Sequence, residues 1–373
     1  MWCYKQPVTI YCGNGEIAKF ADIIAKQGVT RGILVCDPFL SKNGFAKKLM
    51  ESSRGMLVDI FDDVRPNPTV KNVDDCADLI RSSSADFVVA LGGGSSMDCA
   101  KAAASVAVGD KSIVCYHATG VPLPEEHLPL VAIPTTAGTG AEVTCSAVLT
   151  NDQKGFKAPV ISDNFYPCVA IVDPELTYTV PRKVTVGTGL DVLAHAIEGY
   201  LSINHQPVCD AVAVHATRLV FEYLEAACAE EIDKVAKEKM AEASVMAGMA
   251  FSIPKTGASH ACSFILTNQY GIPHGEACGL TLDYFVRINA EAEDGRMHRF
   301  ARLVGFDDCY KMCDAIADLK KRIGARVDLK DLALTPEDIE NLVQGSHHPN
   351  MNNSPVTITD EMLRRMYTEF VGR

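Results

Sequence analysis

Apolar and polar positions alternate differently in the two halves of the chain. The first half contains short, almost wholly apolar runs that end in turn residues, and these runs cover residues 32–36, 86–91, 130–134 and 169–172. Such runs are typical of strands buried on both faces of a parallel sheet. Helical patterns lie between them, for example over residues 70–82 and 96–107. The alternation predicts a doubly wound, Rossmann-like α/β domain.

The second half is rich in Ala, Leu, Met, Glu and Lys, and β-rich runs disappear after Pro181. Helical patterns there cover residues 188–202, 210–230, 231–249 and 363–371. A change of pattern at a single proline indicates a tight junction and not a flexible linker. We therefore expect two domains, an α/β domain over residues 1–181 and an all-helical domain over residues 182–373.

Composition excludes several classes of function. The formal net charge of −12 argues against a nucleic-acid partner, because phosphate binding needs a basic face. The 14 cysteines are scattered without any C-x-x-C pair, which indicates reduced thiols in a cytosolic protein. The N-terminus lacks a signal-peptide pattern, and no apolar run approaches the roughly 20 residues that a membrane span needs. We expect a cytoplasmic protein with no membrane partner.

A glycine-rich turn follows the second apolar run. Residues 92–95 read Gly-Gly-Gly-Ser and precede a helix that we expect over residues 99–107. Glycines let the backbone approach a ligand closely, and a helix N-terminus behind them offers free N–H groups. This combination predicts a pyrophosphate site for a dinucleotide. The spacing is not G-x-G-x-x-G, and a tight turn alone is the alternative reading.

Three further segments fit a dinucleotide. Asp37 ends the first apolar run, where a carboxylate can accept a hydrogen bond from a ribose 2′-hydroxyl and would repel a 2′-phosphate, so it favours NAD over NADP. The alternative for Asp37 is a turn residue before Pro38. Asn67 lies in a rigid turn between two prolines. The loop at residues 135–144 carries four threonines, which suit a phosphate or amide ligand or a capping loop.

Two pairs of residues suggest a metal site in the second domain. Asp191 and His195 are four residues apart, so on a helix they share one face. His260 and His274 are fourteen residues apart and have small neighbours. Each pair also has a structural alternative: Asp191 and His195 as a surface or capping pair, and the two later histidines as surface residues or hydrogen-bonded core residues. Together, three imidazoles and one carboxylate suit Fe²⁺ or Zn²⁺.

These motifs resemble one known family. The stretches that carry the resemblance occur in the family's order and are Gly92-Gly-Gly-Ser-Ser-Met-Asp-Cys-Ala-Lys101, Pro134-Thr-Thr-Ala-Gly-Thr-Gly-Ala-Glu-Val-Thr144, Asp191-x-x-x-His195, His260 and Pro273-His274-Gly275. From about residue 8 to 371 the chain resembles the iron-containing, or group III, alcohol dehydrogenases. The resemblance implies a dinucleotide domain followed by a helical metal-binding domain, with the active site in the cleft between them.

The resemblance also implies particular site residues. The metal ligands would be Asp191, His195, His260 and His274, with Fe²⁺ as the first expectation and Zn²⁺ as the alternative. The NAD(H) contacts would be Asp37, Asn67, Gly93, Gly94, Ser95, Asp98, Thr135, Thr136, Thr139, Thr144 and Lys157. Many members carry a further histidine four residues after the third ligand, and Phe264 occupies that position here. A proton relay through that side chain is therefore not expected.

Residues 257–264 and 271–278 are similar to the family's sulfoacetaldehyde and phosphonoacetaldehyde reductases. We expect NADH-dependent, reversible reduction of a small aldehyde to its primary alcohol, with sulfoacetaldehyde to isethionate first and phosphonoacetaldehyde or a neutral short-chain aldehyde as alternatives. Donors for an anionic group would come from residues 144–146, Asn268 and residues 346–355, the last otherwise an exposed polar loop. A dehydroquinate synthase-like lyase and a non-catalytic NAD- and metal-binding protein are the rival classes. We also expect a homodimer.

Overall fold

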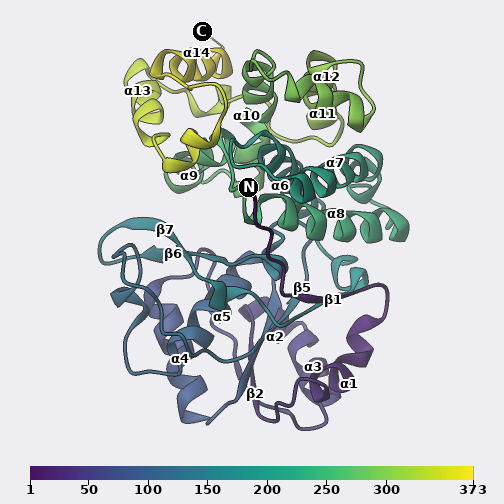
Figure 1. Ribbon diagram of the computed structural model, residues 1–373, viewed down its shortest axis with the longest axis vertical. Helices are drawn as coiled ribbons and strands as arrows, with labels where there is room; N and C mark the ends of the chain where they lie inside the picture. Colours follow the sequence, from purple (N-terminus) through teal and green to yellow (C-terminus); the bar gives the residue numbers. More distant parts are fainter. Residues whose placement is uncertain (373) are drawn as a thin grey trace. The chain divides into compact units, whose positions relative to one another are not determined.

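The computed structural model describes residues 1–372, and these divide into two compact units (Figure 1). The sheet unit comprises residues 5–136 and 140–178. The helical unit comprises residues 1–4, residues 137–139 and the chain from Thr179 onward. Each unit has its own hydrophobic cores.

The sheet unit is built on six parallel strands in the order β1-β8-β5-β4-β2-β3. The strands are β1 (Thr9–Cys12), β2 (Gly32–Val35), β3 (Leu57–Phe61), β4 (Phe87–Gly92), β5 (Leu130–Pro134) and β8 (Val169–Val172). The four inner strands are entirely buried and are the four that the apolar runs predict. The edge strands β1 and β3 are partly exposed, so they lack the continuous apolar run on which the prediction relied.

Helices cover both faces of this sheet. They are α1 (Phe20–Ala25), α2 (Pro38–Lys42), α3 (Phe45–Ser52), α4 (Val70–Ser82) and α5 (Gly94–Val106). Val88 and Ala90 of β4 belong to the same core as α4 and α5. Val89 and Leu91 point to the other face and belong to the core formed with α1 and α3. The doubly wound α/β arrangement is thereby confirmed, since alternate side chains of one strand meet helices on opposite faces.

A two-stranded antiparallel hairpin lies outside the main sheet. It consists of β6 (Ser146–Asn151) and β7 (Phe156–Ile161). Buried and partly exposed side chains alternate along β6, which is the pattern of a strand with one covered face. Such alternation produces no continuous apolar run, and the hairpin was not predicted.

The helical unit contains no strand among its described residues, as predicted. Its helices are α6 (Arg182–Leu201), α7 (Pro207–Ala227), α8 (Lys234–Ser252), α9 (Ala258–Tyr270), α10 (His274–Asn289), α11 (Arg296–Val304), α12 (Cys309–Arg322), α13 (Pro336–Gly345) and α14 (Asp360–Val371). Helix α6 is buried along most of its length and contributes to the core shared with α7, α8, α10, α11 and α12. It is therefore the central helix of the unit.

Close packing of α10 on α6 depends on a glycine. A Cβ atom at Gly275 would lie 2.0 Å from the backbone oxygen of Gly187 and 3.0 Å from the Cβ of Asp191. Only a residue without a side chain lets the two backbones come this close. Because Gly275 follows His274 directly, this packing brings the His274 imidazole to the carboxylate on α6.

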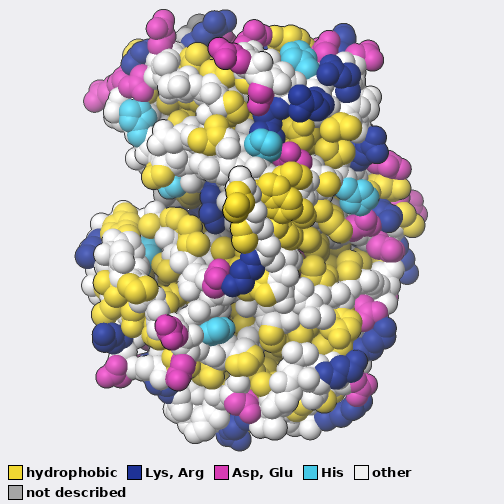
Figure 2. All heavy atoms as spheres, in the orientation of Figure 1, with side chains coloured by type: hydrophobic (Ala, Val, Ile, Leu, Met, Phe, Trp, Pro, Cys, Tyr) yellow, Lys and Arg dark blue, Asp and Glu magenta, His cyan; other side chains and the backbone are white. Residues whose placement is uncertain are grey.

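Two surface properties bear on the expected partners. Among the described residues, no helix combines the length and the apolar character needed to cross a membrane. Figure 2 shows acidic and basic side chains interspersed on the visible face, with no single basic patch there. All 14 cysteines are free thiols, and eight of them lie in the hydrophobic cores of the two units.

Candidate metal and dinucleotide sites

The four predicted metal ligands come from three helices and meet at one carboxylate oxygen. Asp191 and His195 lie one turn apart on α6, His260 lies on α9, and His274 is the first residue of α10. The Oδ1 atom of Asp191 is 3.4 Å from the Nε2 atom of His260, 3.8 Å from that of His274 and 3.9 Å from that of His195. Ligands of one small ion at tetrahedral angles lie about 3.3–3.8 Å apart.

The tautomer of His260 makes this geometry informative. Its Nδ1 atom is 2.5 Å from Oε2 of Glu198, and a carboxylate can only accept, so Nδ1 carries the hydrogen. In the neutral ring Nε2 is then a lone pair that faces Asp191 Oδ1. Both atoms are buried and have no hydrogen-bond partner. Two buried acceptors facing each other need a cation between them, so the residues present fit a divalent metal ion.

The charges around the site agree with this reading. Although burial opposes ionisation, the surrounding histidines hold the pKa of Asp191 well below its ordinary value. Burial lowers the pKa of His195 to about 4, which leaves a neutral imidazole, the form that binds metals. The charges of Cys278 and Glu198 outweigh burial and raise the pKa of His260, so without a metal ion the cluster favours a proton on this ring, in the position where a metal ion would supply the positive charge.

Access to the cluster differs between its members. The side chains of Asp191, His195 and His260 are 4%, 7% and 5% exposed, whereas that of His274 is 35% exposed. Phe264 lies next to His274, with ring centroids 6.4 Å apart. A substrate can therefore approach from the side of His274, where Phe264 supplies an apolar surface and no proton.

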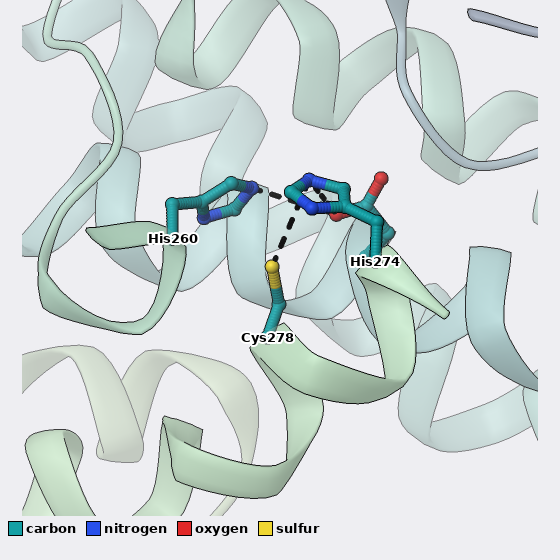
Figure 3. A group of neighbouring side chains, drawn as sticks. His260, His274 and Cys278 are labelled. Carbon is teal, nitrogen blue, oxygen red and sulfur yellow. Dashed lines mark hydrogen bonds and ion pairs between the residues drawn. The ribbon is translucent and has the colours of Figure 1, made fainter. Parts of the chain in front are cut away.

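Two further residues of this site were not identified from the sequence. Cys278 lies one turn after His274 on α10, and its sulfur is 3.8 Å from His274 Nε2 (Figure 3). Glu198 lies on α6 and accepts hydrogen bonds from the backbone N–H groups of Gly257 and Ser259 as well as from His260. The available signal was spacing, since both residues follow a predicted ligand by three or four positions on the same helix.

Glu198 is expected to act as a positioning residue for the metal site. Glu198→Gln keeps an oxygen acceptor but removes the charge that holds Nδ1–H of His260, and we expect metal affinity to fall about 10–100-fold. Competition with a chelator measures this directly. The matched control is Glu242→Gln, which removes a carboxylate from an exposed pair with His215. Equal metal affinity in Glu198→Gln and the wild type would refute the role.

The predicted dinucleotide residues gather at one edge of the sheet unit. Strands β5, β4 and β2 are neighbours and run parallel, so their carboxyl ends lie side by side. Asp37 follows β2, Gly93 follows β4, and Thr135 and Thr136 follow β5. Ligands of open α/β sheets bind outside the carboxyl ends of the strands, so this edge is the expected place for a dinucleotide.

Helix α5 begins at Gly94, five residues earlier than the expected start at Cys99. Gly94, Ser95 and Asp98 are therefore helical residues and not part of a preceding loop. The N-cap residue Gly93 has no side chain to satisfy the first N–H groups of the helix. Those groups remain available to a phosphate, which is the arrangement that the glycine-rich turn predicted.

Several predicted contacts form a connected polar group beside α5. The backbone N–H of Asn67 donates to Ser95 Oγ at 3.2 Å, and Lys157 Nζ donates to Asn67 Oδ1 at 2.8 Å. Asn67 has a φ of 56°, a left-handed conformation that asparagine tolerates better than most residues. The hairpin strand that carries Lys157 thus meets the Asn67 turn and the start of α5.

Two other residues that were predicted to contact the cofactor form hydrogen bonds within the protein. Asp98 Oδ2 accepts from the backbone N–H of Val148, and Thr144 Oγ1 accepts from the buried Lys101 Nζ at 3.0 Å. These bonds fix the hairpin and the threonine loop to α5. Thr139 lies in the helical unit.

Asp37 was expected either to bind a ribose hydroxyl or to be a turn residue before Pro38. Its Oδ1 atom accepts from the backbone N–H groups of Phe39 and Leu40 and caps α2. No hydrogen bond to its Oδ2 atom occurs within the described part of the chain. Asp37 is thus a helix cap through one oxygen, and its contact with a ribose hydroxyl stays a prediction.

Both halves of the chain match one known protein family. Residues 7–174 match the family described as iron-containing alcohol dehydrogenase, and residues 185–371 match the C-terminal domain of the Fe-containing alcohol dehydrogenase family. The chain is 34% identical to the NAD-dependent methanol dehydrogenase of Bacillus methanolicus, with 91% of this chain and 92% of that protein covered. It is 35% identical to the 1,3-propanediol dehydrogenase of Klebsiella pneumoniae, with 91% and 90% covered.

A solved structure is similar over the whole chain. It is the sulfoacetaldehyde reductase of Bifidobacterium kashiwanohense in complex with NAD⁺, with 56% sequence identity, a TM-score of 0.98, and coverage of 100% of this chain and 99% of that one. Family matches over both halves, relatives above 30% identity and the shared fold agree. This chain belongs to the iron-containing alcohol dehydrogenase family.

Proposed function

We propose that this enzyme uses NADH and a bound divalent ion to reduce sulfoacetaldehyde reversibly to isethionate. As a member of its family, the chain is an alcohol or aldehyde oxidoreductase. The observation that carries the metal part is the facing pair of buried, unpartnered acceptors, Asp191 Oδ1 and His260 Nε2. The substrate rests on the 56% identity to the Bifidobacterium kashiwanohense reductase and on the residues described next.

Different residues would serve different steps of aldehyde reduction. When bound, the divalent ion supplies a Lewis acid for the aldehyde oxygen. Asp191, His195, His260 and His274 would hold it, and Glu198 would keep Nε2 of His260 directed toward it. Reduction adds a hydride from NADH to the carbonyl carbon and a proton to its oxygen. Since Phe264 cannot donate a proton, we assign that proton to water or a ribose hydroxyl of the cofactor.

His348 is the side chain that we assign to the anionic group of the substrate. Its ring lies against Phe264 with centroids 4.7 Å apart, and Phe264 in turn neighbours the accessible ligand His274. Its Nδ1 atom accepts from the backbone N–H of Asn350, so the neutral ring carries its hydrogen on Nε2. Burial lowers the pKa of His348, which favours this neutral donor.

Most of the other polar residues of the 346–355 segment have hydrogen-bond partners within the protein. Ser346 bonds to Tyr367, and the amides of Asn350 and Asn353 donate to the hydroxyl and carbonyl oxygens of Thr256. The segment is thus fastened to the start of α9 instead of forming an exposed loop. His348 is left as its best donor for a sulfonate.

Removal of the His348 side chain is expected to lower activity with an anionic aldehyde much more than activity with a neutral one. A hydrogen bond to a charged group contributes about 1.5–3 kcal/mol, so His348→Ala should lower kcat/KM for sulfoacetaldehyde about 10–100-fold. Butyraldehyde, which lacks the anion, should change little, and His348→Gln should restore part of the loss because it keeps a donor. If wild-type enzyme prefers butyraldehyde, the anionic substrate is wrong. Phosphonoacetaldehyde belongs in the same panel as the alternative anion.

The rival lyase has less support. A dehydroquinate synthase-like enzyme needs Lys and Arg around a phosphorylated substrate. Among the described residues, the side-chain partners of the metal donors are carboxylates, imidazoles, a serine and a thiol. This donor set suits a metal ion and a small aldehyde.

A further inference from the structure

We propose that the thiolate of Cys278 is a further ligand of the metal ion, in addition to the aspartate and the three histidines. This inference rests on the proposed metal site. It adds one residue to the four ligands that the family resemblance implies.

Helix geometry places Cys278 at the ion. It follows His274 by four residues on α10, so the two side chains share one face. Cys278 is fully buried. In Figure 3 its sulfur points into the space between the imidazoles of His260 and His274.

The distances fit a single ion. One ligand atom from each of Asp191, His260, His274 and Cys278 lies within 4.8 Å of all the others, and His195 reaches this group through its 3.9 Å separation from Asp191 Oδ1. The Cys278 sulfur is 3.8 Å from His274 Nε2, the same separation that Asp191 Oδ1 has from that nitrogen. A sulfur–zinc bond of about 2.3 Å is longer than a nitrogen bond, so sulfur can lie slightly further out and still bind.

The thiol of Cys278 is within hydrogen-bond distance of His274 Nε2, but this contact leaves two other buried atoms of the cluster without a partner. Asp191 Oδ1 and His260 Nε2 are buried without hydrogen bonds. One S–H group is a weak donor and carries a single hydrogen, so it cannot satisfy two acceptors. A cation contacts the carboxylate, the imidazoles and the sulfur at the same time.

A neighbouring cysteine supplies the contrast. Cys262 is also buried and lies only two residues after His260, but its thiol interacts with the hydroxyl groups of Tyr367 and Ser346. It therefore belongs to the packing between α9, α13 and α14. Of the two buried cysteines that follow metal ligands, only Cys278 joins the metal cluster.

A thiolate changes the chemistry of the site. Binding forms a sulfur–metal bond, breaks the S–H bond and releases its proton to solvent. Sulfur is a softer donor than carboxylate or imidazole, so it moves the preference of the site from Fe²⁺ toward Zn²⁺. This identifies Cys278 as a residue that determines which metal the enzyme holds.

Cobalt spectroscopy tests the proposal. Metal-free full-length protein is loaded with one equivalent of Co²⁺, and its spectrum is compared with those of Cys278→Ser and Cys262→Ser. The visible d–d bands report occupation of the site, and a near-ultraviolet thiolate-to-cobalt band reports sulfur ligation. We expect both features in the wild type and in Cys262→Ser, and loss of only the near-ultraviolet band in Cys278→Ser.

The outcomes separate this inference from the proposed function. Wild-type d–d bands without a thiolate band overturn sulfur ligation and leave the metal site standing. Absence of both features overturns the metal site and the inference together. If Cys278→Ser does not fold, X-ray absorption of the wild-type zinc protein decides. A sulfur scatterer at about 2.3 Å supports the proposal, and a shell of nitrogen and oxygen alone contradicts it.

Discussion

His260→Ala is expected to abolish stoichiometric metal binding and to lower kcat/KM for aldehyde reduction about 1000-fold or more. The His260 ring is bound by Glu198 on one side and faces Asp191 on the other. A side chain from the surface therefore cannot take its place as a metal ligand. Polarisation of a carbonyl oxygen by a metal ion is worth several kcal/mol, and each 1.4 kcal/mol is about tenfold in rate. Metal analysis of the purified variant and steady-state kinetics measure the two effects.

A companion variant protects this test from a folding defect. His260→Ala leaves Glu198 and Asp191 buried without their partner, so it also lowers stability. His274→Ala removes a ligand that is 35% exposed and should retain the fold. The control is His215→Ala, which removes an imidazole that is 49% exposed on α7. A metal-loaded, fully active variant at either ligand position would contradict the assignment.

Asp37→Ser is expected to lower the preference for NADH over NADPH at least tenfold. A like charge beside a 2′-phosphate costs several kcal/mol, and each 1.4 kcal/mol corresponds to a factor of about ten. Serine removes the charge but can still cap α2, a role that Asp37 fills through Oδ1.

The comparison with Asp37→Ala separates the two roles of this carboxylate. Both variants should gain activity with NADPH, because both lose the charge. Only Asp37→Ala should lose about 1 kcal/mol of stability, since alanine cannot cap α2. Kinetics with both cofactors and thermal unfolding give the two readouts. An unchanged cofactor preference in both variants would show that Asp37 is a helix cap and nothing more.

How far the fold could be predicted depended on burial. Strands β2, β4, β5 and β8 are buried on both faces and therefore appear as continuous apolar runs. The edge strands and the β6–β7 hairpin keep one face partly exposed. Their short alternation of apolar and polar residues is hard to distinguish from the sequence of a loop. The start of α5 was placed too late, because glycines at 93 and 94 suggest a turn when no tertiary context is known.

The metal site shows a similar limit. Histidine and aspartate are visible as possible ligands because their chemistry differs from that of their apolar neighbours. Glu198 and Cys278 also lie at ligand spacing, but one glutamate or cysteine in a helix usually has another explanation. Only the packing of α9 and α10 on α6, made possible by Gly275, shows that both side chains reach the same cluster.

The central claim is that a divalent ion at the Asp191 cluster makes this chain an NADH-linked aldehyde reductase. Its most direct test is NADH oxidation with sulfoacetaldehyde by metal-free enzyme that is titrated with Fe²⁺ or Zn²⁺. The account predicts negligible turnover without metal and full recovery at one ion per chain. Full activity of the metal-free enzyme would contradict it.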